Sequence, residues 1–160
     1  MKNHDHPMQK HNKHYRKLVV MALLSFACMY VLMYAMVNSV ANVFPNINQF
    51  YMAGLMMSPM IIIEVLLMQS MYRNKKLNVL IIAGSAVLLI AFFFFIRQQA
   101  AVSDKQFLKS MIPHHAGAIL MCNEADIKDP EIKKLCEEIR LSQQREIEQM
   151  KAKLAELKNR

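Results

Sequence analysis

Residues 18–37 read LVVMALLSFACMYVLMYAMV, a run of twenty residues without one charged side chain. A helix of about 20 apolar residues is roughly 30 Å long, which matches the hydrocarbon core of a bilayer. Two similar runs follow, at residues 50–71 with the single charge of Glu64, and at residues 77–96, which end in AFFFFI. The sequence therefore predicts an all-α protein with three transmembrane helices over residues 18–37, 50–71 and 77–96.

The first of these runs could also be a secretory signal peptide. Its apolar stretch is longer than the usual core of such a peptide, and no small-residue cleavage pattern follows it. We therefore expect an uncleaved membrane helix.

Basic residues flank the three runs unevenly. Five precede the first run and three lie between the second and third, whereas the connection NSVANVFPNINQ (38–49) has none. These residues are Lys2, Lys10, Lys13, Arg16, Lys17, Arg73, Lys75 and Lys76. Because basic flanks stay in the cytoplasm, we expect a multi-pass protein of the bacterial plasma membrane, with a cytoplasmic N-terminus and residues 97–160 in the periplasm.

The same distribution explains the net charge. The whole chain has a formal charge of +8, but residues 97–160 contain twelve basic and ten acidic residues. The excess basicity therefore lies mainly beside the membrane runs, where it orients the protein. It does not favour a nucleic-acid partner.

Residues 97–160 predict a helical hairpin. Ser103 and Gln106 fit a capping box at the first helix start, and Asp129, Pro130 and Glu131 are typical of a second start. Apolar residues then recur at the spacing of one helix face. The expected inner faces are Phe107, Met111, Ala118, Met121 and Ala125, then Ile132, Leu135, Cys136, Ile139, Ile147, Met150, Leu154 and Leu157.

Two helices alone do not enclose a core, because each has a single partner for its apolar stripe. Four antiparallel helices do. We therefore expect two chains to pair their hairpins into a four-helix bundle outside the membrane, as a homodimer or a higher homo-oligomer.

The stretch MIPHHAGAILMC (111–122) combines a proline with several metal-binding side chains. A proline inside a helix removes one hydrogen bond and costs on the order of 3 kcal/mol, and the resulting kink would re-aim His114 and His115. Met111, His114 and Met121 share one helix face, and His115 and Cys122 share the next.

Thioether, thiolate and imidazole donors together favour Cu(I) or Ag(I), whereas zinc rarely accepts methionine. The alternative interpretation is that these methionines and histidines serve only packing or lie on the surface.

Residues 107–154 resemble the family known as domain of unknown function 305. Its Met-x-x-His-His stretch corresponds to Met111, His114 and His115, and its Gln-x-x-Glu-Ile-x-x-Met pattern corresponds to Gln143, Glu146, Ile147 and Met150. The resemblance covers roughly residues 104–154.

This resemblance implies a ferritin-like helical fold, a half-bundle in this chain, and a role in copper or silver binding and tolerance. Larger members contain more helices, which favours pairing between chains. By analogy the ligands are Met111, His114, His115, Met121 and Met150, with Glu146 as a further candidate.

Cys122 and Cys136 lie at similar distances from the predicted hairpin turn near Lys128, so they can face each other. Outside the cytoplasm such a pair is a disulfide, a pair of thiolate metal ligands or two buried thiols. Cys28 lies within the first membrane run.

Ten of the fifteen methionines lie in the first two membrane runs. In the second run they form a stripe around an intramembrane carboxylate, at Met57, Met60, Glu64, Met68 and Met71. One interpretation is a packing face, in which a protonated Glu64 bonds to Tyr30, Tyr34 or Asn38. The other is a thioether relay for Cu(I), similar to that of eukaryotic copper importers.

Residues 1–17 contain four histidines, namely His4, His6, His11 and His14. The segment has no apolar periodicity, so we expect no regular structure there. The histidines could collect a metal on the cytoplasmic side, or the segment could be only a basic membrane anchor.

The sequence thus predicts a membrane-anchored copper-binding or silver-binding protein that contributes to metal tolerance in the cell envelope. Its expected partners are the bilayer, a second copy and a copper donor or acceptor protein. No catalytic constellation is apparent, so we do not expect an enzyme. The alternatives are a Cu(I) transporter that uses the membrane methionines and a dimerisation module without metal.

Overall fold

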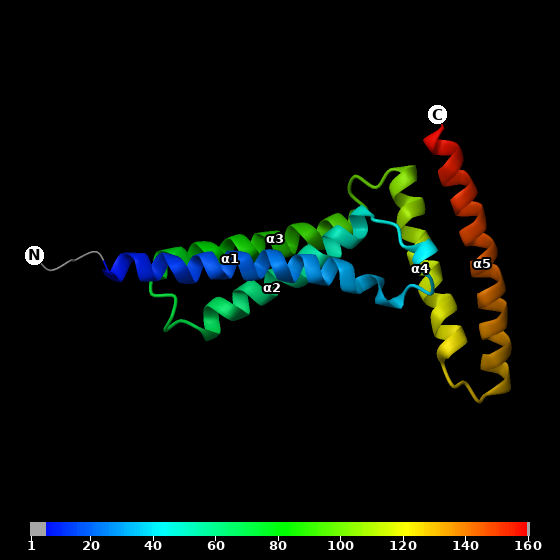
Figure 1. The fold of residues 1–160 in the computed structure, drawn as a ribbon, viewed down its shortest axis with the longest axis horizontal. Helices are drawn as coiled ribbons and strands as arrows, with labels where there is room; N and C mark the ends of the chain where they lie inside the picture. The colour runs from blue at the N-terminus through cyan, green and yellow to red at the C-terminus, as the bar shows by residue number, and fades with distance from the viewer. Residues whose placement is uncertain (1–5, 160) are drawn as a thin grey trace, which may run out of the picture. The chain divides into compact units, whose positions relative to one another are not determined.

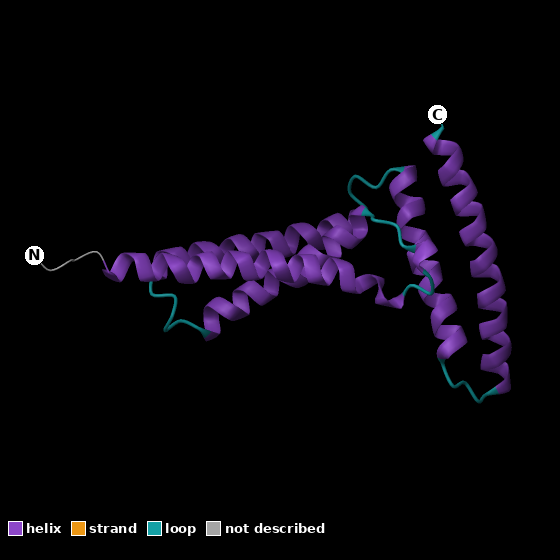
Figure 2. Ribbon diagram, viewed as in Figure 1, coloured by secondary structure: helices purple, strands orange, loops and turns teal. Residues whose placement is uncertain are grey.

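A computed structural model describes the backbone of residues 6–159 and the side chains of residues 13–159. Over the described residues the chain is all-helical and contains no strand (Figures 1 and 2). The α-helices are α1 (His6–Leu32), α2 (Ile47–Leu67), α3 (Lys75–Gln98), α4 (Asp104–Glu124) and α5 (Pro130–Lys158). Two short 3₁₀ helices, η1 (Met33–Met36) and η2 (Val40–Asn42), separate α1 from α2.

The chain divides into two compact units. The membrane unit combines the chain up to Val31 with Phe50–Ala100, and the hairpin unit combines Leu32–Gln49 with the chain from Ala101 onward. The connection between the first two membrane helices thus folds with the C-terminal hairpin, which the sequence did not predict.

In the membrane unit, three helices are long and apolar enough to cross a membrane, namely Lys13–Met36, Ile47–Leu67 and Lys75–Gln98. The three expected runs are therefore confirmed as candidate spans. Most of their large apolar side chains, among them Leu23, Leu24 and Leu80, are exposed. Such a surface is unfavourable in water and is what lipid would cover.

Helix boundaries differ from the prediction, most clearly at the start of the first helix and the end of the second. The segment expected to lack regular structure is helical from His6, because residues 8–17 contain no proline or glycine and a helix already formed extends at little cost. The second membrane helix ends at Leu67 instead of Met71, and residues 68–71 form turns.

Aromatic side chains hold the membrane helices together at two levels. The rings of Tyr15 and Tyr72 are 5.3 Å apart, and the Tyr15 hydroxyl donates a hydrogen bond of 2.8 Å to Asn78 Oδ1. At the other level the Phe92 ring lies directly over Gly54, where a Cβ would overlap it. Tyr51 donates a hydrogen bond of 2.9 Å to the Ala100 carbonyl.

The hairpin unit contains α4 and α5, which run antiparallel and side by side (Figure 1). Both predicted caps are present, since Ser103 accepts from the N–H of Gln106 and Asp129 accepts from the N–H groups of Glu131 and Ile132. The reciprocal half of the capping box is absent. The Gln106 side chain accepts a 3.0 Å hydrogen bond from Ile47 N in the α1–α2 connection instead.

The core of the hairpin unit is not made by two helices alone. Buried side chains of both helices meet there, and Val37 and Phe44 of the α1–α2 connection pack against them. The fully buried set is Ile112, Ala116, Ile119, Ile147 and Leu154. The chain therefore supplies part of the cover for which we expected a second copy.

The backbone of this connection also approaches α4 closely. A Cβ at Gly117 would lie 3.4 Å from the carbonyl oxygen of Met36. An added Cβ would therefore make an ordinary van der Waals contact, and this approach does not by itself require glycine.

The predicted inner faces are correct for the half of α5 that contains Ile147 and Leu154. They are wrong at several positions. Phe107 and Met121 on α4, and Ile132 and Leu135 on α5, are about half exposed. The apolar periodicity continues along the whole of α5, but the buried core contains no residue of the first turns of this helix.

Candidate metal site

The inward face of α4 contains His115, not His114. Ile112, Ala116 and Ile119 are buried at the spacing of one helix face, and His115 lies between them with only 6% of its surface exposed. His114 is one position further round the helix and is exposed. The two rings are 6.0 Å apart, centre to centre.

Both ring nitrogens of His115 face oxygen atoms. Nδ1 lies 2.9 Å from the Met111 carbonyl oxygen, and Nε2 lies 2.7 Å from Oε2 of Glu146 on α5. A carbonyl only accepts, so Nδ1 carries a proton. The bond at Nε2 then needs a second proton, which is held either by an imidazolium paired with a carboxylate or by Glu146 itself.

This contact between His115 and Glu146 fixes the level at which the two helices face each other. One helical turn away from it, four residues back on α4 and four forward on α5, lie Met111 and Met150. Met150 packs against the hairpin core, and Met111 is half-buried. Helical spacing therefore places two methionines about one turn, roughly 5.4 Å along the axis, from the buried imidazole.

Met121 does not belong to this level. It is ten residues along α4 from Met111, which corresponds to about 15 Å along the helix axis. Its side chain is 54% exposed. Although helical periodicity places both methionines on one face, a single ion cannot bind both.

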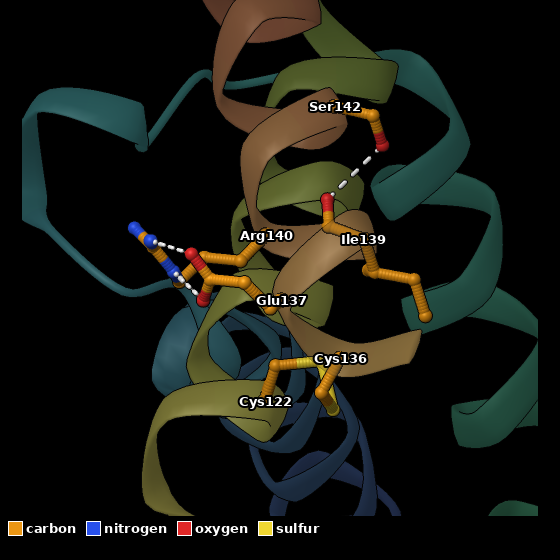
Figure 3. The surroundings of a disulfide bond; sticks show 6 residues. All are labelled: Cys122, Cys136, Glu137, Ile139, Arg140 and Ser142. Carbon is orange, nitrogen blue, oxygen red and sulfur yellow. Dashed lines mark hydrogen bonds and ion pairs between the residues drawn. A yellow bond between two sulfur atoms is a disulfide. The ribbon is translucent and has the colours of Figure 1, made fainter. Parts of the chain in front are cut away.

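The cysteine candidates are also placed differently. Cys122 and Cys136 form a disulfide between α4 and α5, the first of the three states left open by the sequence (Figure 3). Neither sulfur is a thiolate in this form, so the expectation of Cys122 or Cys136 as a ligand is not met here. Cys28 is a free, exposed thiol.

Among the described residues, no three His, Cys, Asp or Glu side chains gather where they could hold a metal ion. At the His115 level the additional donors are the thioethers of Met111 and Met150. That combination suits a soft monovalent ion and does not suit zinc, magnesium or calcium. The donor set therefore fits Cu(I) or Ag(I).

Glu64 lies one turn from the end of α2, where Tyr72 is a hydrogen-bond partner. The Tyr72 hydroxyl donates a hydrogen bond of 3.3 Å to Glu64 Oε1. Burial raises the pKa of the Tyr72 hydroxyl, and the nearby Glu64 carboxylate raises it further. The sequence does not predict Tyr72 as the partner of Glu64, because it indicates a helix that continues through Met71.

The methionine stripe of the second membrane run is interrupted. Met57 and Met60 lie on α2 and are half-buried. Met68 and Met71 follow the end of the helix and pack against the cluster of Leu18, Val65 and Tyr72. A continuous row of five groups on one helix face is therefore absent from the described part of α2.

Of the N-terminal histidines, only His14 has a described side chain. It is half-buried, and its Nδ1 atom is buried without a hydrogen-bond partner among the described residues. The side chains of His4, His6 and His11 lie outside the described residues.

The chain is similar to a known protein family. The model of the domain of unknown function 305 (DUF305) matches residues 64–154, more than half of the chain. The match begins in α2, so the expected limit of residues 104–154 was too narrow.

An uncharacterized protein of Acanthamoeba polyphaga mimivirus is 37% identical over 144 residues, which cover 88% of this chain and 93% of the relative. No solved structure matches the chain significantly. On these matches, the chain belongs to the domain of unknown function 305 family.

Proposed function

We propose that the hairpin unit binds a soft monovalent metal ion, Cu(I) or Ag(I), at the level of His115. The observation that carries the proposal is the bond from His115 Nδ1 to the Met111 carbonyl. Metal-binding histidines almost always donate their second ring N–H to such an oxygen, because the bond fixes the tautomer and leaves Nε2 as the ligand.

In the structure, Glu146 lies at Nε2. Its side chain is 49% exposed, whereas that of His115 is 8% exposed. Glu146 can therefore turn outward into solvent while the imidazole keeps its place. On metal binding, Nε2 loses its proton and Glu146 withdraws. In this proposal Glu146 closes the empty site and is not a ligand.

Met111 and Met150 would supply thioether ligands from the two helices. Both lie one turn from the ion pair, and methionine side chains adapt to irregular spaces. His114 is exposed beside the site and would be the ligand through which an ion enters or leaves. Met121 is excluded by its axial distance.

We place this site on the extracytoplasmic face of the membrane. The basic flanks favour a cytoplasmic N-terminus. With three spans, the α1–α2 connection and residues 101–159 then lie on the same side, which agrees with their folding as one unit. The protein would buffer copper or silver beside the membrane, or pass the ion to a partner protein, in metal tolerance.

The test uses the full-length protein in detergent and competition for Cu(I) with a coloured chelator. We expect His115→Ala to weaken binding at least tenfold, and Met150→Leu, which keeps the side-chain volume, to weaken it as well. Met121→Leu and His14→Ala are matched controls that should bind like the wild type. Equal affinities for all four variants would disprove the site.

Pairing of two hairpin units is a separate proposal. Ile132 and Leu135, three residues apart on α5, leave an apolar surface that the chain itself does not cover. If two copies pair through this surface, Ile132→Glu with Leu135→Glu should convert a dimer into a monomer in light-scattering measurements. A wild-type protein that is already monomeric at micromolar concentration would refute the pairing.

A further inference from the structure

The Cys122–Cys136 disulfide lies at the closed end of the hairpin, beside the turn that connects α4 to α5. It joins residues 14 positions apart, with their Cα atoms 5.3 Å from each other. Seven residues of α4 separate Cys122 from His115, about 10 Å along the axis, so the pair is distinct from the proposed His115 site.

This disulfide is open to solvent, unlike a bond sealed in a core. Both cysteines are half-buried and line a hollow of about 300 Å³. Figure 3 draws the bond beside Glu137 and Arg140. A small thiol, or the thiolate of another protein, can therefore reach the sulfur atoms.

Charged side chains of both signs line the hollow, namely Lys133, Glu137 and Arg140. Arg140 donates two hydrogen bonds, of 3.0 and 2.6 Å, to Glu137, and these bonds lower the pKa of the Glu137 carboxyl. Glu137 therefore balances the charge of Arg140, and Lys133 adds one positive charge to the hollow. A cationic side chain beside a sulfur pair favours anionic sulfur species there.

We propose that Cys122 and Cys136 form a second, redox-controlled site for one monovalent soft metal ion. A dithiol reductant supplies two electrons and two protons, which break the S–S bond and give two thiols, and the reductant becomes a disulfide. Each thiol then releases a proton, and the two thiolates bind one Cu(I) between them. The complex carries one negative charge, which Lys133 offsets.

The spacing of the cysteines suits this arrangement. Two thiolates on opposite sides of one ion lie about 4.6 Å apart, taking a metal–sulfur bond of about 2.3 Å. Rotation about the Cα–Cβ bonds can separate the sulfurs by that distance while the Cα atoms stay at 5.3 Å. Oxidation removes both ligands, so the disulfide form is the closed state of the site.

The experiment uses the full-length protein in detergent with Cys28→Ser, which leaves only the pair. The protein is reduced with a dithiol, the reductant is removed without oxygen, and Cu(I) is titrated against a chelator. We expect the reduced protein to bind one more Cu(I) per chain than the oxidised protein, with a thiolate-to-copper absorption band. Adding Cys122→Ser and Cys136→Ser should abolish that extra ion.

The two proposed sites are distinguished by His115→Ala, which should leave the extra ion of the reduced protein unchanged. Equal numbers of bound ions in the reduced and oxidised forms would overturn the redox-controlled site. So would a thiol count showing that the disulfide resists reduction while the protein keeps its helical signal. The comparison of the two redox forms does not require the Cys122→Ser or Cys136→Ser variant to fold.

Discussion

Replacement of Glu146 by alanine tests the central contact of the hairpin. The change removes the acceptor of the 2.7 Å bond from His115 Nε2 and leaves a buried N–H group unpaired. A hydrogen bond to a charged group contributes about 1.5–3 kcal/mol. Because the Glu146 side chain is 49% exposed, water screens part of this, and we expect a loss of about 1–2 kcal/mol.

The same change should strengthen metal binding. If Glu146 only closes the empty site, its removal destabilises the metal-free form and leaves the metal-bound form unaffected. The difference of about 1–2 kcal/mol then appears as roughly 5- to 30-fold tighter Cu(I) binding. Opposite effects on stability and on affinity are therefore expected from a single substitution.

Thermal unfolding followed by circular dichroism measures the first effect, with an expected decrease of roughly 2–8 °C in the unfolding midpoint. Chelator competition measures the second. Glu138→Ala is the control, because it removes the same side chain from an exposed position of α5. Unfolding midpoints equal to that of the control would refute the role of the ion pair, and weaker Cu(I) binding would identify Glu146 as a ligand.

Three further predictions concern stability. Gly54→Ala should destabilise the membrane unit by about 1–3 kcal/mol through overpacking, whereas Gly84→Ala, with no atom within 4 Å of the added Cβ, should be neutral or stabilising in detergent unfolding; similar losses for both would contradict the close contact. Reduction of the disulfide should lower the free energy of unfolding by about 3 kcal/mol, as expected for a loop closed across 14 residues, and an unchanged denaturation midpoint would count against it. Ile147→Ala should cost about 2–5 kcal/mol and Ile132→Ala less than about 1 kcal/mol, unless a second copy covers Ile132, in which case both losses are large.

Most of the secondary structure could be predicted from the sequence. The membrane helices follow from the lengths of the apolar runs, and the start of α5 follows from Asp129 and Pro130. The helix ends were less certain, because the membrane run up to Met71 has no proline or glycine near Leu67 to mark the end of α2. There the pairing of Tyr72 with Tyr15 and Glu64 accompanies the turn.

The candidate site was predicted only in part. Periodicity indicated which residues share a helix face, but it gave equal weight to His114 and His115 and placed Met121 with Met111. Burial of one histidine depends on the partner helix, and the level of Met150 depends on the register between α4 and α5. Neither can be derived from one helix alone.

The helical class, the three membrane runs and the soft character of the donor set follow from the amino-acid sequence, because these depend on composition and on local spacing. The folded chain was needed to find that the α1–α2 connection covers the hairpin, that His115 pairs with Glu146, and that Cys122 is bonded to Cys136. Local propensity acts over a few residues, whereas these contacts join segments whose approach depends on packing across the whole unit.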